Sequence, residues 1–229
     1  MLVMEYDTSV PIVGAVVDRV IGAWGQRRRI EMKGFGATVS PFTRKIRVAA
    51  IETGQPDLID WEMVTMTDKP AALAENNPLD KVPVVILDDG RQLYDSPVIC
   101  EYLDSLHDGP KLIPADGEAR WEVLRLQALG DGMCDAAVLY GGEMRRPEEF
   151  RYQPFIERQL AKLAAGLDRL EGEVDRLAGP LTIAAIAVAT AIGYMEVREC
   201  WPDWRDTRPR LAAWYDAFCR RPSMVETAP

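Results

Sequence analysis

The hydrophobic pattern of this chain changes about halfway along its 229 residues, and that change constrains the fold more than any other feature. In residues 32–107, short apolar runs of strand length alternate with helical segments. In residues 118–229 the pattern is helical only. Alternation is typical of an α/β domain, whereas a succession of helices forms a bundle. We therefore predict an α/β domain and an all-helical domain, joined by a linker rich in proline and glycine and preceded by an N-terminal extension at 1–31.

The α/β domain is expected to follow the order β-α-β-α-β-β-α. Its segments are strand 32–37, helix 40–54, strand 58–64, helix 70–75, strands 82–87 and 91–94, and helix 96–107. Ser40-Pro41 and Ser96-Pro97 open the two longer helices, because serine is a favoured N-cap and proline a favoured first helical residue.

The helical domain carries a stripe of apolar residues spaced alternately four and three apart, which predicts a helix in an antiparallel bundle rather than an extended coiled coil. The stripe consists of Ile156, Leu160, Leu163, Leu167, Leu170, Val174 and Leu177. The apolar run Leu181–Tyr194, broken by Thr182 and Thr190, predicts a buried central helix that is too short to cross a bilayer. Residues 208–220 predict a closing amphipathic helix.

Composition narrows the function classes. The chain has 36 acidic and 27 basic residues, a net charge of −9, which argues against nucleic acid as its main partner. The single histidine, His107, excludes His-rich metal sites, and we expect no metal. Four dispersed cysteines form no C-x-x-C pair, and residues 1–31 make a poor signal peptide, so we expect a cytoplasmic protein. Residues 1–31 are either a dispensable extension before a start at Met32 or an accessory helix docked on the body.

Five motifs, in the right order, resemble those of glutathione S-transferases. They are the strand–helix junction 40–47, the cis-proline loop 77–85, the γ-glutamyl-binding turn and helix 93–103, the buried helix 181–194 and the closing helix 208–223. The Ser40-Pro41-Phe42 sequence is most similar to serine-type bacterial members akin to the plant tau class. The resemblance implies a thioredoxin-like domain followed by an all-helical domain, and a homodimer.

The resemblance also implies an activity. We expect a glutathione transferase that binds glutathione as co-substrate, stabilises its thiolate and conjugates it to small apolar electrophiles in detoxification. Two alternatives stay open: a non-catalytic binding or scaffold protein of the same fold, and a glutathione-dependent peroxidase, isomerase or dehalogenase.

Ser40 is the candidate catalytic residue. Thiols have a pKa near about 8.5, so a transferase must stabilise the sulfur anion, and a helix N-terminus offers unpaired N–H groups and partial positive charge. In the family, the serine of Ser-Pro-Phe donates a hydrogen bond to the sulfur. The alternative is that Ser40 only caps its helix. Serine rather than cysteine at this position disfavours thiol–disulfide chemistry.

The other candidate residues would bind glutathione. The resemblance implies a cis Val82-Pro83 peptide whose Val82 backbone pairs with the cysteinyl backbone of glutathione. Ser96, as a helix N-cap, would hold the γ-glutamyl carboxylate, and Asp95 would face the α-ammonium group. Trans proline and simple capping are the alternatives.

Cations must offset the charge of glutathione, which is anionic like the protein. Lys81 matches a binding lysine of the serine-type classes, and Lys69 could reach the glycyl carboxylate unless it is merely solvated. Arg44 and Arg47 are expected to be structural or at the surface. The electrophile pocket would lie between the domains, with wall candidates chosen by position alone that also suit the core: Phe42, Met133, Tyr140 and Trp201.

Overall fold

A four-stranded mixed sheet forms the centre of the N-terminal half. The computed structural model describes residues 32–229 except 66 and 202, so both interpretations of residues 1–31 lie outside the described part. The strands are β1 (Met32–Gly36), β2 (Ile59–Met63), β3 (Val84–Ile86) and β4 (Gln92–Leu93). Their order in the sheet is β2-β1-β3-β4, with β1 parallel to β2 and antiparallel to β3, and β3 antiparallel to β4.

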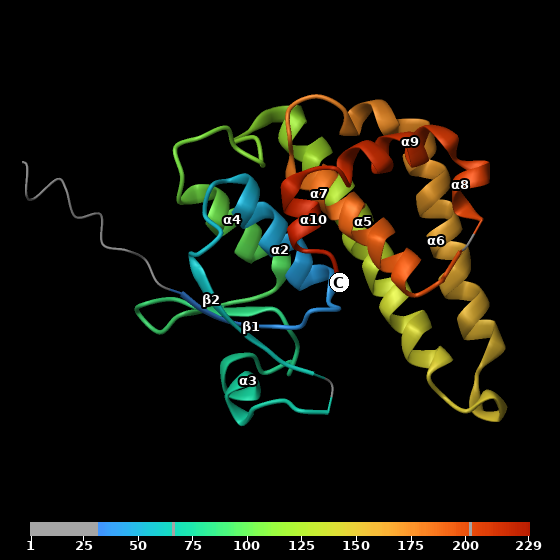
Figure 1. Ribbon diagram of the computed structural model, residues 1–229, viewed down its shortest axis with the longest axis horizontal. Helices are drawn as coiled ribbons and strands as arrows, with labels where there is room; N and C mark the ends of the chain where they lie inside the picture. Colours follow the sequence, from blue (N-terminus) through green and yellow to red (C-terminus); the bar gives the residue numbers. More distant parts are fainter. Residues whose placement is uncertain (1–31, 66, 202) are drawn as a thin grey trace, which may run out of the picture.

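Three helices accompany this sheet: α2 (Pro41–Glu52), α3 (Ala71–Asn76) and α4 (Ser96–Ser105). Figure 1 shows α2 and α4 together on one side of the sheet and α3 on the other. The observed order is the predicted β-α-β-α-β-β-α.

The C-terminal half is helical. Its helices are α5 (Gly117–Met144), α6 (Gln153–Glu173), α7 (Ile183–Val197), α8 (Trp204–Thr207), α9 (Pro209–Phe218) and α10 (Pro222–Glu226), with 3-10 turns at Glu148–Phe150 and Val174–Leu177. The predicted class, a thioredoxin-like domain followed by a helical domain, is confirmed. The sequence pattern did not predict α8 or α10, because helices of four and five residues carry too little periodicity to recognise.

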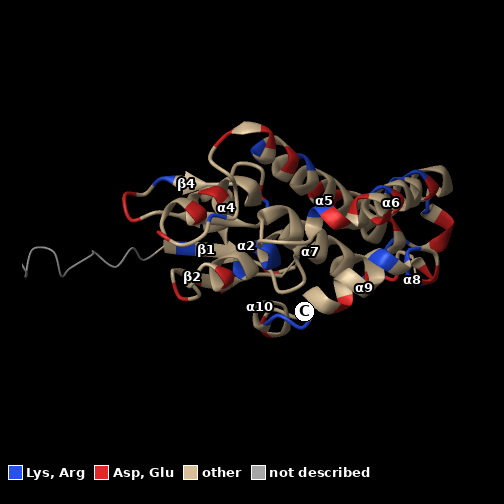
Figure 2. Cartoon of the chain, turned by 90° about the horizontal axis from the view of Figure 1, so that it is seen from above, with Lys and Arg blue, Asp and Glu red and all other residues tan. Residues whose placement is uncertain are grey.

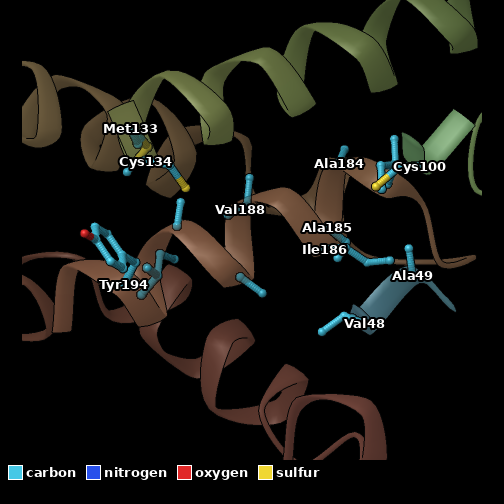
Figure 3. Packing of buried hydrophobic residues seen from close by; sticks show 14 of the residues in the cluster. Val48, Ala49, Cys100, Met133, Cys134, Ala184, Ala185, Ile186, Val188 and Tyr194 are labelled. Carbon is cyan, nitrogen blue, oxygen red and sulfur yellow. The ribbon is translucent and has the colours of Figure 1, made fainter. Parts of the chain in front are cut away.

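Helix α7 lies at the centre of the hydrophobic core. Residues 183–195 of α7 are all buried, as the apolar run predicted. Figure 3 shows Val48 and Ala49 of α2 on one side of α7 and Cys134 of α5 on the other. A Cβ at Gly130 of α5 would lie only 2.8 Å from the backbone of Ala187, so this glycine lets the two helices pack closely. One hydrophobic cluster therefore joins both halves of the molecule.

The apolar stripe of α6 packs as a bundle helix. Ile156, Leu163, Leu167 and Leu170 are buried, and α6 lies against α5 and α9. The prediction of a helix in a bundle is therefore confirmed.

The C-terminal segment is fastened to α2 by side chains near the two ends of that helix. The Glu52 carboxylate accepts hydrogen bonds from Arg221 Nε at 2.7 Å and Nη2 at 2.6 Å, and from the Ser223 hydroxyl. Arg44 donates from Nη2 to the Met224 carbonyl at 3.1 Å and from Nε to Thr227 Oγ1 at 3.4 Å. Helix α10 is thus held beside the helix that Ser40 opens.

We expect the interaction of Glu52 with Arg221 and Ser223 to contribute less to folding stability at low pH. Hydrogen bonds from Arg221 lower the pKa of Glu52 in the folded state, so the unfolded chain takes up this proton first. The stabilisation is fully present above the unfolded pKa of about 4.3 and is lost as the pH falls through the folded pKa. In urea unfolding, the stability difference between wild type and Glu52→Gln should shrink from about pH 7 to about pH 3. A constant difference would contradict this assignment, and Glu226→Gln, an exposed carboxyl of α10, serves as control.

Candidate functional site

Ser40 occupies the N-cap of α2, as predicted. Its backbone is extended, with φ −81° and ψ 121°, and Pro41 follows in the first turn. The Ser40 Oγ accepts a hydrogen bond from the Thr43 N–H at 3.2 Å. Because the hydroxyl acts as an acceptor in this bond, its own hydrogen stays free to be donated.

Ser40 also lines a small pocket between the two halves of the molecule. The cavity itself is small, about 10 Å³, within a recess of about 190 Å³ that includes open solvent. Its lining consists of Thr38, Val39, Ser40, Pro41, Arg44, Thr190, Tyr194 and Pro229. One wall is the β1–α2 junction, and the facing wall is α7 together with the C-terminal segment.

The wall residues chosen from the sequence do not line this pocket. Met133 is 3% exposed and packs towards Gly166, so it is a core residue. Phe42, Tyr140 and Trp201 are half-buried against the main core.

The sequence analysis missed Thr190, Tyr194 and Arg44. The break at Thr190 in an otherwise apolar run was the one signal that could have pointed to α7 as a wall. Arg44 is buried and bonded to the C-terminal segment, which agrees with the structural alternative expected for it, but its place in the pocket lining was not predicted.

The loop before β3 has the predicted cis peptide at Val82-Pro83. Asn77 organises this loop: its side chain donates to the Lys81 carbonyl at 2.7 Å and accepts from the Leu79 N–H at 3.1 Å. Val82 precedes β3 and takes no part in the strand pairing of the described residues.

The start of α4 differs from the prediction by one residue. Asp95 is the N-cap and Ser96 is the first helical residue, because the Asp95 carbonyl accepts the first helical bond, from the Ile99 N–H at 3.1 Å. The Tyr94-Asp95 peptide is also cis. Ser96 is 1% exposed, and its Oγ has no hydrogen-bond partner among the described residues. Buried hydroxyls are normally paired, so the Ser96 hydroxyl is an exception in the described part of the chain.

A group of charges from both halves lies near the start of α4. Lys45 is 1% exposed, and its Nζ lies 2.6 and 2.7 Å from the two carboxylate oxygens of Asp131 on α5. Burial raises the pKa of Asp131 against the opposing pull of Lys45, and Asp95 raises it further. Burial likewise raises the pKa of Asp135, with Lys81 opposing and Asp95 adding. The sequence analysis did not anticipate Lys45, Asp131 or Asp135 here.

The two candidate lysines differ in their surroundings. Lys69 Nζ lies 2.8 Å from Asp80 Oδ2 and donates to the Asp80 carbonyl at 2.9 Å, so an incoming carboxylate would compete with Asp80. Lys81 is exposed and forms no ion pair within the described part of the chain.

Metal clusters and membrane-spanning helices are both absent from the described residues, 32–229 without 66 and 202. No group of three or more His, Cys, Asp or Glu side chains in that part is arranged to hold a metal ion. None of its helices combines the length and the apolar character needed to cross a membrane.

Comparison with known families identifies the fold. A model of the glutathione S-transferase N-terminal domain matches residues 35–111, and a model of the glutathione S-transferase C-terminal domain matches residues 153–217. Together they match more than half of the chain. The chain belongs to the glutathione S-transferase family. This confirms the family to which the sequence motifs pointed.

Several family members are similar over most of their length. A glutathione transferase family member from Pseudomonas fluorescens Pf-5, solved with bound glutathione, is 42% identical, with a TM-score of 0.83 and coverage of 86% of this chain and 98% of its own. The same description applies to a second structure from that source, with bound S-(propanoic acid)-glutathione, at 42% identity, the same coverage of both chains and a TM-score of 0.79. The uncharacterized GST-like protein YibF of Escherichia coli (strain K12) is 34% identical over 86% of this chain and 98% of its own.

Proposed function

We propose that this protein is a glutathione transferase that stabilises the glutathione thiolate and conjugates it to small apolar electrophiles. The observation that carries the proposal is Ser40: a hydroxyl with a free hydrogen, at a helix N-terminus, on the wall of a pocket between the two domains. The hydroxyl and the first N–H groups of α2 would share the negative charge of the sulfur. Lowering the thiol pKa by about two units corresponds to roughly 2.7 kcal/mol in favour of the thiolate.

The remaining candidate residues would hold the rest of glutathione. The Val82 backbone, presented by the cis peptide, would pair with the cysteinyl backbone. The unpaired Ser96 hydroxyl and the N-terminus of α4 would bind the γ-glutamyl carboxylate, and exposed Asp95 would attract the α-ammonium group. Lys81 and Lys69 would attract the glycyl carboxylate of glutathione. Phe42, two residues after Ser40 at the start of α2, would also contact glutathione.

The glutathione bound to the Pseudomonas fluorescens family member supports glutathione as the ligand of this chain. We further propose that the protein is a serine-type member akin to the tau class and a cytoplasmic homodimer that acts in detoxification. Its two domains would span residues 32–107 and 118–229. The exposed apolar side chains of Val98 on α4 and Trp121 on α5 support a partner surface.

The proposal is tested by glutathione-dependent turnover of 1-chloro-2,4-dinitrobenzene, together with retention on glutathione resin and release by free glutathione. Retention with turnover is the expected result. If the protein is retained on the resin but turns over none of a panel of electrophiles, the non-catalytic alternative is favoured. If it reduces a hydroperoxide included in that panel, a peroxidase is favoured.

Ser96→Ala should separate binding from stability. Loss of a charge-assisted hydrogen bond to the γ-glutamyl carboxylate should weaken glutathione binding about tenfold. The free energy of unfolding without ligand should stay level or rise, because a buried unpaired hydroxyl is removed. Calorimetric titration and urea unfolding measure the two effects. Ser105→Ala, at the exposed end of the same helix, is the control, and unchanged binding in Ser96→Ala would remove Ser96 from the site.

A further inference from the structure

Arg44 is a buried cation that has no acidic partner among the residues that the structure describes. Two arginines are buried in the described part of the chain: Arg208 at 6% exposure and Arg44 at 9%. Arg208 forms an ion pair with Asp168 at 2.7 Å. Arg44 hydrogen-bonds only to a carbonyl and a hydroxyl, and no carboxylate among the described residues pairs with it. Buried charges are normally paired, so the exception needs an explanation.

Three carboxylates on the helices that pack near Arg44 are engaged by other arginines. Glu52, on the same helix, pairs with Arg221 at 2.6 Å. Glu196 of α7 and Asp216 of α9 both pair with Arg205, at 2.7 and 2.6 Å. The missing counter-ion of Arg44 is therefore not supplied by these neighbours.

The guanidinium of Arg44 has one nitrogen, Nη1, whose hydrogen-bond donors are unused among the described residues. Nε and Nη2 bind Thr227 and Met224, whereas Nη1 has no hydrogen-bond acceptor among the described residues. Gly193 of α7 makes room for it, since a Cβ there would lie 2.7 Å from Nη1. Figure 2 shows the basic stretch of α2 beside α7, in the middle of a protein whose net charge is −9.

A second cation, outside the pocket lining, contacts Tyr194 of the facing wall. Arg198, one turn beyond Tyr194 on α7, donates from Nε to the Tyr194 hydroxyl at 3.0 Å, with its guanidinium carbon 5.0 Å from the ring centroid. Arg198 likewise forms no ion pair in the part of the chain described here. The hydroxyl of Tyr194 accepts this bond, so its hydrogen is free for a ligand.

We propose that the pocket beside Ser40 selects electrophiles that carry a carboxylate, with Arg44 as the group that binds it. This rests on the proposed function and adds to it: Val39, Pro41 and Pro229 would contact the apolar body of the substrate. Guanidinium binds carboxylate through charge-assisted hydrogen bonds, which are stronger when the site is shielded from water. Arg44 follows Ser40 by one helical turn, so the bound carboxylate would lie near the reacting sulfur.

A matched pair of substrates tests the selection: 4-chloro-3-nitrobenzoate and 4-chloro-3-nitrobenzamide. In both, the glutathione thiolate attacks the ring carbon that bears chlorine, an S–C bond forms, and chloride leaves with the C–Cl electron pair. The carboxylate and the amide are not consumed in the reaction. The two substrates therefore differ in the group that Arg44 would recognise and, modestly, in how strongly that group activates the ring. The difference in activation is the same for every variant, so it cancels when variants are compared.

The measured quantity is the ratio of kcat/KM for the benzoate to kcat/KM for the benzamide. Arg44→Met removes the charge with similar volume and should lower this ratio about tenfold or more. Arg44→Lys should keep part of it. Arg47→Met, on the same helix but outside the pocket lining, is the control, and its ratio should match wild type. An equal ratio in wild type and Arg44→Met would overturn the proposal.

A binding experiment on the unmodified protein decides the matter even if Arg44→Met does not fold or neither substrate reacts. S-(2-carboxyethyl)glutathione and its amide analogue are compared by calorimetric titration. The carboxylate should bind about tenfold more tightly, and salt should reduce the difference. Equal affinities would overturn the selection while leaving glutathione binding intact. If both adducts and glutathione itself fail to bind, the proposed function fails, and this inference fails with it.

Discussion

Ser40→Ala is expected to lower kcat/KM about a hundredfold, comparable to removing one preorganised donor from an anion site. The Ser40 hydroxyl lies at the N-terminus of α2 with its hydrogen free, so alanine removes the hydrogen bond to the sulfur but keeps the N–H groups. The pKa of bound glutathione should rise by about one to two units. The ultraviolet absorbance of the thiolate across pH measures this rise. The activity of the variant should recover at high pH, where the thiolate forms unaided.

Two further variants at Ser40 separate catalysis from capping. Alanine also removes the cap to the Thr43 N–H, at a cost of about 1 kcal/mol in folding stability. Ser40→Asp keeps a capping acceptor but cannot donate when ionised, and its charge repels the thiolate, so it should fold well and remain inactive. Ser40→Thr keeps the hydroxyl and should restore part of the activity. If Ser40→Ala leaves both the thiolate spectrum and the rate unchanged, Ser40 is only a cap.

Asp131→Asn is expected to destabilise the fold by about 3–5 kcal/mol, because it leaves the Lys45 ammonium buried without a counter-charge. Lys45 is 1% exposed, and the pair links α2 of the first domain to α5 of the second. Urea unfolding of the full chain measures the loss.

The pair can be dissected by a double-mutant cycle. Lys45→Met should cost less than Asp131→Asn, because Asp131 is 17% exposed on its side chain and its raised pKa lets it take up a proton. A carboxyl whose folded pKa is raised binds more protons in the folded state, so the stability of Lys45→Met should fall as the pH rises through that pKa. Lys45→Met combined with Asp131→Leu should recover most of the loss. If the two single variants each cost nothing, the pair has no structural role.

Much of the scaffold was predictable because its signals are local. Ser40-Pro41 opens α2 with a cap and a first-turn proline, and the apolar run beginning at Leu181 predicts a buried helix whatever surrounds it. The cis Val82-Pro83 peptide was predicted from the motif around it. The predicted N-cap of α4 was wrong by one residue, because Asp95 and not Ser96 is the N-cap.

The pocket and the interdomain charges were not predictable in the same way. Arg44 bonds Thr227, 183 positions further along the chain, and Lys45 pairs with Asp131, 86 positions away. No local pattern distinguishes these residues from the solvated Arg and Lys of an ordinary amphipathic helix.

The sequence by itself determined the order of strands and helices, the hydroxyl at the start of α2 and the apolar central helix, because caps and periodicity act within a few residues. Only the tertiary structure decided which polar groups were buried and which partners they found: the Ser96 hydroxyl has none among the described residues, and Arg44 has a carbonyl and a hydroxyl but no carboxylate. Burying Ser96 and Arg44 depends on how α2, α4, α7 and the C-terminal segment pack together. The packing of distant segments sets both the solvation and the partners of a side chain, and those two quantities make a polar residue a candidate site.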